Sequence, residues 1–365
     1  MIVFNHTSAE PIIGNDAFRG VSALIDLRNF SETPSFWDDW DVCGGELYKV
    51  CDEGICGENI SWYYGEQARG GMLRMTGTGD MPDYEEAYER PWDEFRFKLN
   101  RLVIEEGITK VGNHAFEGTN ISYAMLPESV TSIGENSFIG CLFHYICTPS
   151  SIPYSTAQAL ILTESITSIG NRAFEYSYNL ESAYIPASVT TIGNRLFSRC
   201  RKLAEITLET GNPIYDSRDN CNAIIETSSN KLVMGCQGTI IPNTVTTIDE
   251  YAFYWCLNLS SITIPASVTT IIGNPFEGSP ISGEESILST ILVDENNAVY
   301  DSRNNCNAII ETNTNKLIVG CKGSVVPEGV TSIGTVAFYG CVGLTSLSLP
   351  NSLTSIETSA FMYCI

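Results

Sequence analysis

Two stretches decide the fold of this chain: Ser-Val-Thr-Thr-Ile-Gly-Asn-Arg-Leu-Phe at residues 188–197 and Gly-Val-Thr-Ser-Ile-Gly-Thr-Val-Ala-Phe at residues 329–338. The same pattern recurs around eight phenylalanines, which are Phe116, Phe138, Phe174, Phe197, Phe253, Phe276, Phe338 and Phe361. Four of the intervals between neighbours in this series are 22 or 23 residues, and the three longer intervals contain insertions. A fixed period of this length indicates stacked repeats.

Each part of the repeat has a physical role in a stacked coil. Leu259, Ile262 and Ile264 direct apolar side chains to one face of a short strand, and Pro265 ends that strand because it lacks an N–H. A second extended stretch follows, and the glycine after it is expected to permit a tight corner. This glycine is Gly170, Gly193 or Gly334 in three of the copies. A single coil cannot bury its phenylalanine alone, so we predict a repeat solenoid, mostly β with short turns and 3-10 or helical segments.

A cysteine follows the phenylalanine by three residues in five copies, namely Cys141, Cys200, Cys256, Cys341 and Cys364. We interpret these thiols as buried, small apolar groups that stack inside the array. The shortest insertion, around residues 148–154, is rich in proline and serine and is predicted to be a surface loop.

The two long insertions are near-duplicates, residues 215–256 and 300–341. Each contains Cys-Asn-Ala-Ile-Ile-Glu-Thr, a polar turn and Lys-Leu-x-x-Gly-Cys, which predicts β-hairpin insertions at about 210–241 and 295–326. In the first hairpin we expect the cross-strand pairs Glu226–Lys231, Ile225–Leu232, Ala223–Met234 and Cys221–Cys236. The second hairpin would bring Cys306 opposite Cys321. Whether these two cysteine pairs are disulfides or free thiols is left open by the sequence.

The amino-terminal part differs from the repeats. Residues 31–97 contain 16 acidic and 5 basic residues, and strand-like alternation runs through residues 56–104. We divide the chain into a degenerate repeat-like segment at 1–35, an acidic β-rich cap at 36–101 and eight repeats at 102–365. Trp62, Met75 and Trp92 are expected to plug the open core of the first coil. Cys43, Cys51 and Cys56 are interpreted as one disulfide plus one free thiol.

The charge balance excludes several classes of partner. A net charge of −23 disfavours nucleic acid and anionic membrane surfaces. No run of apolar residues is long enough for membrane insertion, and no signal peptide is visible in this chain. Nucleophile, phosphate-loop and metal-ligand motifs are likewise missing from the sequence, so we expect no enzyme and no cofactor.

The string Ile-x-Ile-Pro-x-Ser-Val-Thr-Thr-Ile-Gly-x-x-x-Phe-x-x-Cys resembles the BspA-type leucine-rich repeat, also called the Treponema pallidum type. The resemblance covers residues 102–365. It implies a right-handed, curved leucine-rich-repeat array with strands on its concave face. It also implies a cell-surface or secreted protein that acts in adhesion or protein binding and has no catalytic residues.

In Leu-x-x-Ile-x-Ile, the third and fifth residues are expected to point out of the concave face. The first coils place Tyr123, Met125, Ile161 and Tyr184 at these positions, whereas later coils offer mainly Ser and Thr. We predict that these four residues bind a protein or glycan on another cell or on host matrix. The alternative is a structural or spacer array within a larger surface protein.

Overall fold

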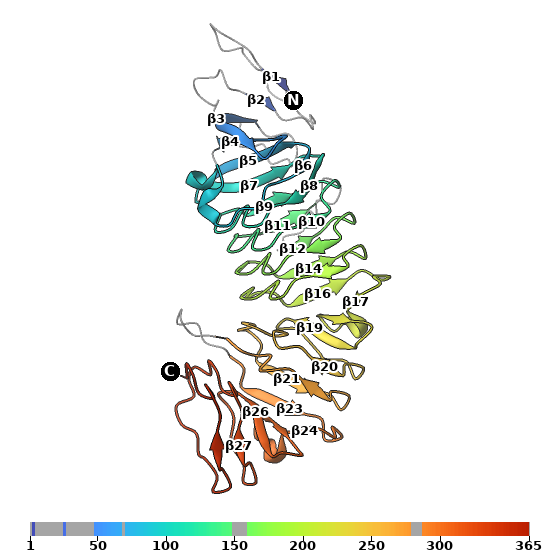
Figure 1. Ribbon diagram of the computed structural model, residues 1–365, viewed down its shortest axis with the longest axis vertical. Helices are drawn as coiled ribbons and strands as arrows, with labels where there is room; N and C mark the ends of the chain where they lie inside the picture. Colours follow the sequence, from blue (N-terminus) through green and yellow to red (C-terminus); the bar gives the residue numbers. More distant parts are fainter. Residues whose placement is uncertain are drawn as a thin grey trace, which may run out of the picture. The chain divides into compact units, whose positions relative to one another are not determined.

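The computed structural model describes residues 2–3, 25–26, 47–67, 70–147, 159–278 and 287–364. Its contacts divide the chain into two compact units, Met1–Phe174 and Glu175–Ile365, and each unit is described by itself. Both consist mainly of short strands and turns (Figure 1). Among the described residues the helical segments are 3-10 turns, namely η2 (Ala87–Glu89), η3 (Asp93–Phe95), η4 (Arg218–Asn220) and η5 (Arg303–Asn305). The expected β-rich repeat fold is confirmed.

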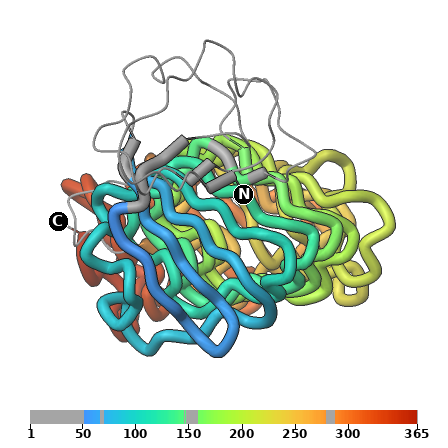
Figure 2. The backbone as a smooth tube through the Cα atoms, turned by 90° about the horizontal axis from the view of Figure 1, so that it is seen from above, coloured from blue at the N-terminus to red at the C-terminus, as the bar shows by residue number. Residues whose placement is uncertain are grey.

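In the first unit, one strand from each coil contributes to a continuous sheet, here called the first strand row. It starts with three antiparallel strands and continues in parallel, in the order β3 (Leu47–Cys56), β4 (Ile60–Gln67), β5 (Gly70–Gly77), β7 (Leu99–Ile104), β9 (Tyr123–Met125), β11 (Tyr145–Cys147) and β12 (Ala159–Ile161). The short strands β1 (Ile2–Val3) and β2 (Ile25–Asp26) precede β3 in parallel pairing. Figure 2 shows the coils of this unit, blue to green, lying side by side.

Strand β11, which lies between the coils of Phe138 and Phe174, was not predicted from the sequence. Its register aligns Tyr145 with Tyr123 on one side and with Ala159 on the other. The chain after Cys141 therefore returns to the first strand row before the insertion. The predicted surface loop around residues 148–154 lies outside the described residues.

A second row of parallel strands closes each coil of the first unit, in the order β6 (Gly79–Asp80), β8 (Ile108–Val111), β10 (Ser132–Ile133) and β13 (Ser168–Ile169). The aromatic column of the core is stacked, with successive ring centroids 5.7, 5.3 and 5.7 Å apart for Trp92, Phe116, Phe138 and Phe174. Trp92 is therefore the first ring of the column. Its indole Nε1 donates a hydrogen bond to the carbonyl of Ala115 at 2.9 Å.

The cap strands bury the residues that were expected to plug the first coil. Trp62, Met75 and Trp92 are all buried, and the rings of Trp62 and Trp92 meet edge to face at 6.3 Å. Strand β5 pairs directly with β7, so the cap and the first coils share one sheet. The compact units defined by contacts meet after Phe174, and the division of the chain after residue 101 stays a prediction.

The corner glycine has a different role from the one expected. Left-handed φ angles of 53–56° occur two residues before the phenylalanine, at His114, Asn136 and Arg172. Gly170 has no such angle, but a Cβ there would lie 2.4 Å from the backbone nitrogen of Glu135 in the preceding coil. The glycine thus permits close stacking of coils, and the turn itself is made by other residues.

In the second unit the same two kinds of strand recur, interrupted by the hairpins. The strands that correspond to the first row form two parallel pairs, β14 (Ser182–Ile185) with β16 (Glu205–Leu208) and β21 (Ser261–Ile264) with β23 (Thr290–Val293). Strands of the second kind are β15 (Thr191–Ile192), β20 (Thr247–Ile248), β22 (Thr270–Ile271), β27 (Ser332–Ile333) and β28 (Ser355–Ile356).

Both predicted hairpins are present. The first consists of β17 (Tyr215–Asp216), β18 (Ala223–Glu226) and β19 (Lys231–Gly235), and the second of β24 (Tyr300–Asp301), β25 (Ala308–Glu311) and β26 (Lys316–Gly320). Next to the turn the expected pairs Glu226–Lys231 and Ile225–Leu232 are confirmed. The expected pairing of Ala223 with Met234 is wrong, because a bulge shifts the register and Ala223 pairs with Gly235.

Each hairpin is also part of a coil. Strand β19 pairs in parallel with β20, and β26 with β27, so the hairpins join the second kind of strand. The backbone N–H of Gly235 donates a hydrogen bond to the carbonyl of Ala252, the residue before Phe253. In a regular coil, the backbone N–H of Phe116 donates in the same way to the carbonyl of the residue before Phe138. Gly235 therefore occupies the position of the repeat phenylalanine in a coil that lacks the ring. Its counterpart in the second hairpin is Gly320.

Candidate functional site

Three of the four predicted binding residues lie on the first strand row of the first unit. Tyr123 and Met125 belong to β9, and Ile161 belongs to β12. Tyr123 is 40 % exposed, whereas Met125 and Ile161 are half-buried. On the same strands, the residues next to these outward positions, such as Ala124 and Leu160, are buried. The expected alternation of inward and outward side chains is therefore present in these strands.

Tyr123 has two polar neighbours on adjacent coils. Its ring stacks on the imidazole of His144 with centroids 5.8 Å apart and planes 18° from parallel. The guanidinium carbon of Arg101, on β7, lies 5.7 Å from the centroid of the same ring. Tyr123 was predicted from the sequence but Arg101 and His144 were not, because their proximity to its ring depends on the register between coils.

Tyr184 lies in the second unit, on β14, and is 37 % exposed. Its cross-strand neighbour on β16 is Thr207, and Ser182 on the same strand is paired with the exposed Glu205. The surface around Tyr184 thus includes a carboxylate within the neighbouring strand.

Several exposed apolar residues were not predicted, and two of them lie in the hairpin coils. Ile240 is 75 % exposed and Val325 is 58 % exposed, and they hold equivalent positions in the two near-duplicate insertions. Each stands directly before a buried residue and a proline, as Thr263 stands before Ile264 and Pro265 in a regular coil. The short strings Ile-Ile-Pro and Val-Val-Pro would have indicated these outward positions if the hairpins had been interpreted as parts of coils.

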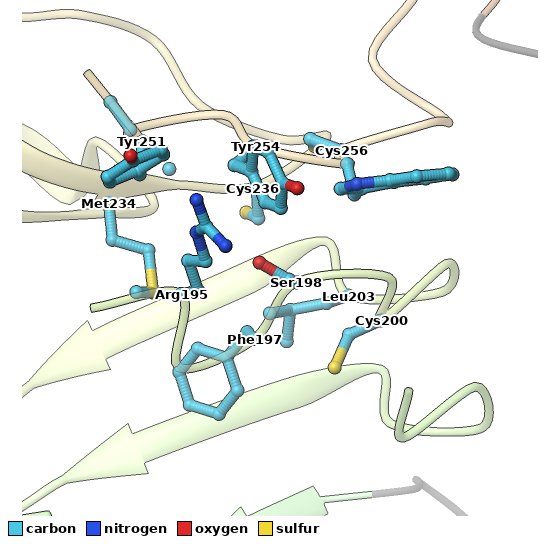
Figure 3. A pocket seen from close by; sticks show the side chains of 13 residues that line it. Arg195, Phe197, Ser198, Cys200, Leu203, Met234, Cys236, Tyr251, Tyr254 and Cys256 are labelled. Atoms are coloured by element: carbon cyan, nitrogen blue, oxygen red, sulfur yellow. The ribbon is translucent and has the colours of Figure 1, made fainter. Parts of the chain in front are cut away.

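Small hollows lie beside the two hairpin glycines, Gly235 and Gly320. Figure 3 shows the first, a cavity of about 20 Å³ lined in part by Phe197, Met234, Gly235 and three cysteines. A space of this size holds about one water molecule. The second, beside Gly320, measures about 30 Å³. We interpret both hollows as packing gaps.

Arginine side chains bridge the coils around the first hollow. The guanidinium carbon of Arg195 lies 4.1 and 4.2 Å from the ring centroids of Tyr251 and Tyr254, between which it is seen in Figure 3. That of Arg199 lies 3.3 Å from the ring of Trp255. Such cation–π contacts are worth about 0.5–2 kcal/mol each and join the coil of Phe197 to that of Phe253.

Two of the five stacked cysteines, Cys141 and Cys200, are buried as expected, whereas Cys256, Cys341 and Cys364 are only partly buried. Cys141 Sγ donates to the carbonyl of Phe116 at 3.3 Å, and Cys364 Sγ donates to that of Phe338 at 2.9 Å. Burial raises the pKa of the Cys141 thiol to about 12. Thiolate is the reactive form, so burial makes this thiol a poor nucleophile at neutral pH.

The hairpin cysteines are free thiols in the structure, which is one of the two alternatives that the sequence left open. Cys221 Sγ donates to the carbonyl of Ala223 at 3.7 Å, and Cys236 Sγ donates to that of Asn222 at 3.3 Å. Cys306 and Cys321 repeat this arrangement in the second hairpin.

In the cap, Cys56 is a free, buried thiol, and Cys43 lies outside the described residues. Within the part of the chain that the structure describes, no group of three or more His, Cys, Asp or Glu side chains is arranged to hold a metal ion.

A family model described as "BspA type Leucine rich repeat region" matches the chain in six copies, at residues 94–161, 154–221, 234–321 and 321–365. These matches cover more than half of the chain. The chain belongs to the BspA-type leucine-rich-repeat family. Its stacked phenylalanines and two kinds of parallel strand are the structural form of that repeat.

Solved structures similar to this BspA-type protein come from bacteria. A leucine-rich repeat protein from Eubacterium ventriosum is 21 % identical, with a TM-score of 0.52 and 86 % of this chain and 95 % of that one covered. A leucine rich cell surface protein from Faecalibacterium prausnitzii is 23 % identical, with a TM-score of 0.44 and coverage of 86 % and 93 %. The first likeness supports the leucine-rich-repeat fold. No curated protein sequence matches significantly.

Among the described residues, no helix has the length and apolar character that a membrane span requires.

Proposed function

We propose that this chain is a non-enzymatic, cell-surface or secreted protein that binds a protein or glycan on another cell or on host matrix. The main support for this proposal is that large side chains are exposed on the first strand row and on the corresponding strands of the second unit. Tyr123 and Tyr184 are 40 % and 37 % exposed on strands whose alternate residues are buried. Tyrosine is a frequent energetic centre of protein interfaces because it adds a large contact area with a polar tip.

Membership of the BspA-type leucine-rich-repeat family supports the same proposal, because the resemblance seen in the sequence implies a surface protein that acts in binding or adhesion. The proposed contact residues are Tyr123, Met125 and Ile161 in the first unit and Tyr184 in the second. Each unit is proposed to contribute its own contact surface.

The test is adhesion of the purified full chain to extracellular matrix laid down by cultured epithelial cells. Replacing Tyr123→Ala together with Tyr184→Ala should remove most of the bound protein and leave the thermal melting curve nearly unchanged, because both rings are partly exposed. Ile240→Ala is the matched control, since it also removes an exposed apolar side chain. Wild-type adhesion that persists in the double variant would contradict the proposal.

The alternative is a structural or spacer array, which the unbroken ring stack from Trp92 to Phe174 also suits. A spacer predicts that neither the wild-type chain nor any of these variants adheres to the matrix. The same adhesion measurement therefore separates the two functions.

A further inference from the structure

One turn of the second unit concentrates positive charge in an acidic protein. Residues 194–203 include no Asp or Glu, whereas the net charge of the whole chain is −23. The same stretch includes the cations Arg195, Arg199, Arg201 and Lys202. Arg195 lines the first hollow, beside Gly235 (Figure 3). The turn therefore offers cations to a ligand that reaches this hollow.

Two of these arginines have no acceptor in the protein. Within the part of the chain that the structure describes, the guanidiniums of Arg195 and Arg199 form no hydrogen bond and no ion pair, and Nε of Arg199 is buried without a partner. Elsewhere in this unit an arginine is paired with a carboxylate, as Arg218 is with Asp216. A guanidinium presents five N–H donors in one plane. Arg195 and Arg199 thus have donors available for an external acceptor.

Aromatic rings of a neighbouring coil hold both guanidiniums in place. The guanidinium carbon of Arg195 lies 4.1 and 4.2 Å from the ring centroids of Tyr251 and Tyr254. That of Arg199 lies 3.3 Å from the ring of Trp255. Stacking covers the faces of a guanidinium and leaves its edge, which bears the N–H donors. Because the rings already restrict these groups, less conformational entropy is lost when a ligand pairs with them.

The hollow beside Arg195 has the size of one oxygen atom and a lining of donors. Its volume is about 20 Å³, close to the space of one water molecule. Ser198 also lines it (Figure 3), and its hydroxyl forms no hydrogen bond with the described residues. Burial raises the pKa values of the three thiols in the lining, those of Cys200, Cys236 and Cys256. These thiols therefore stay protonated at neutral pH and place no negative charge in the hollow.

The second hairpin lacks this arrangement, although its sequence is nearly the same. Two residues before the phenylalanine, where the first site has Arg195, the second has Asn274. Asn274 is buried, and its Nδ2 donates to the carbonyl of Val336, the counterpart of Tyr251, at 2.8 Å. The polar group at this position is thus satisfied within the protein beside the second hollow and left without an acceptor beside the first.

Carboxylates lie around the first hollow but leave Arg195 unpaired. Glu277 interacts electrostatically with Arg195 and with Glu250. Glu175 and Glu205 act on the thiols of the lining. None of these acids forms an ion pair with Arg195 in the described part of the chain. Glu277 is therefore the side chain that competes most directly with a ligand for Arg195.

We propose that the first hollow, with Arg195 and Ser198, receives a carboxylate from an acidic segment of a partner protein. One carboxylate oxygen occupies the hollow and accepts a hydrogen bond from Ser198, and the edge of the Arg195 guanidinium pairs with the same group. A glycan fits less well, because the ring faces beside the hollow are already covered by guanidiniums. The net charge of −23 opposes this ligand only at a distance, since charges more than about 8 Å apart are largely screened at physiological salt.

The inference is independent of the proposed function, because neither Arg195 nor Ser198 is among the proposed contact residues. The test is binding of the full chain to a hexaglutamate peptide, measured by calorimetry beside hexaglutamine at the same ionic strength. We expect hexaglutamate to bind at least about tenfold more tightly than hexaglutamine. Arg195→Gln should weaken binding of hexaglutamate by about tenfold or more. Arg195→Lys keeps a cation without the fork of donors, so its affinity should fall between those of the wild type and Arg195→Gln.

Two further variants complete the test. Lys322→Gln is the matched control and should leave binding unchanged, because Lys322 lines the second hollow. Glu277→Gln removes the competing carboxylate and should strengthen binding by about threefold.

Equal binding of the two peptides, or wild-type binding by Arg195→Gln, would overturn the inference. Tighter binding of a phosphoserine hexapeptide than of hexaglutamate would also overturn it, since the site would then select phosphate over carboxylate. Circular dichroism melts identify any variant that loses folding, and Glu277→Gln tests the site with Arg195 intact.

Discussion

Gly235→Ala tests whether a hairpin coil stacks only because it lacks a side chain at the phenylalanine position. A Cβ at Gly235 would lie 2.3 Å from Cε1 of Phe253 and 2.8 Å from Oγ1 of Thr239. The Phe253 ring cannot retreat, because it is 2 % exposed and stacks on Phe276 at 5.1 Å. Gly235 has no left-handed φ, so the cost arises from the contact alone. Overpacking of this kind costs about 1–3 kcal/mol.

The assay is urea unfolding followed by circular dichroism, and the second hairpin supplies an independent repeat of the experiment. A Cβ at Gly320 would lie 2.1 Å from Cε1 of Phe338, so Gly320→Ala should lower the free energy of unfolding similarly. Gly278→Ala is the control, since its Cβ would meet no atom of the described residues nearer than 3.7 Å.

A double-mutant cycle decides whether the phenylalanine ring is the cause. With Phe253→Ala already present, Gly235→Ala should cost less than it does in the wild type, because the ring that it would strike is gone. The reasoning is refuted if Gly235→Ala and Gly278→Ala are equally mild, or if the cycle shows the two changes to be additive.

Three further predictions concern the core and its thiols. Trp92→Ala should lower the free energy of unfolding by about 3–5 kcal/mol and speed amide exchange around Phe116, because it removes the first ring of the column; an unchanged urea midpoint would contradict this. The raised pKa of Cys141 means that the unfolded thiol ionises from about pH 9 while the folded thiol stays protonated to about pH 12, so stability should fall over that window. Over this pH range the urea midpoint of Cys141→Ala should fall less than that of the wild type. An equal fall in the two proteins would count against the burial argument. Thiol titration in denaturant should give the same count with and without reductant if Cys221 and Cys236 are free, and a higher count after reduction would establish the disulfide alternative.

The hairpins show how far from the turn the strand register can be predicted from the local sequence pattern. The pairs Glu226–Lys231 and Ile225–Leu232 follow from the turn residues and alternation, since both lie close to the turn. Beyond them a bulge moves Ala223 opposite Gly235, and nothing in the alternation of residues 231–236 signals an extra residue. Register errors of this kind grow with distance from the turn, because each pair inherits the register of the one before it.

For the candidate site, the sequence predicted which residues point outward, but it did not predict which residues of other coils lie beside them. The outward direction of Tyr123 follows from the period of two within a strand, and its 40 % exposure agrees with it. The approach of Arg101 and His144 to that ring joins residues from different coils and required the parallel register. The exposed Ile240 was missed because its coil begins with a hairpin and lacks the phenylalanine used for alignment.

The repeat fold, the stacked phenylalanines and the presence of both hairpins were determined by the sequence alone, because each depends on a pattern that recurs within one coil or one turn. Only the tertiary structure decided that β11 joins the first strand row, that Gly235 fills the place of a phenylalanine, and that Gly170 serves close stacking. Those features depend on which coil lies against which. Stacking joins residues that are one or more repeats apart, and a short sequence window contains only one of the two partners.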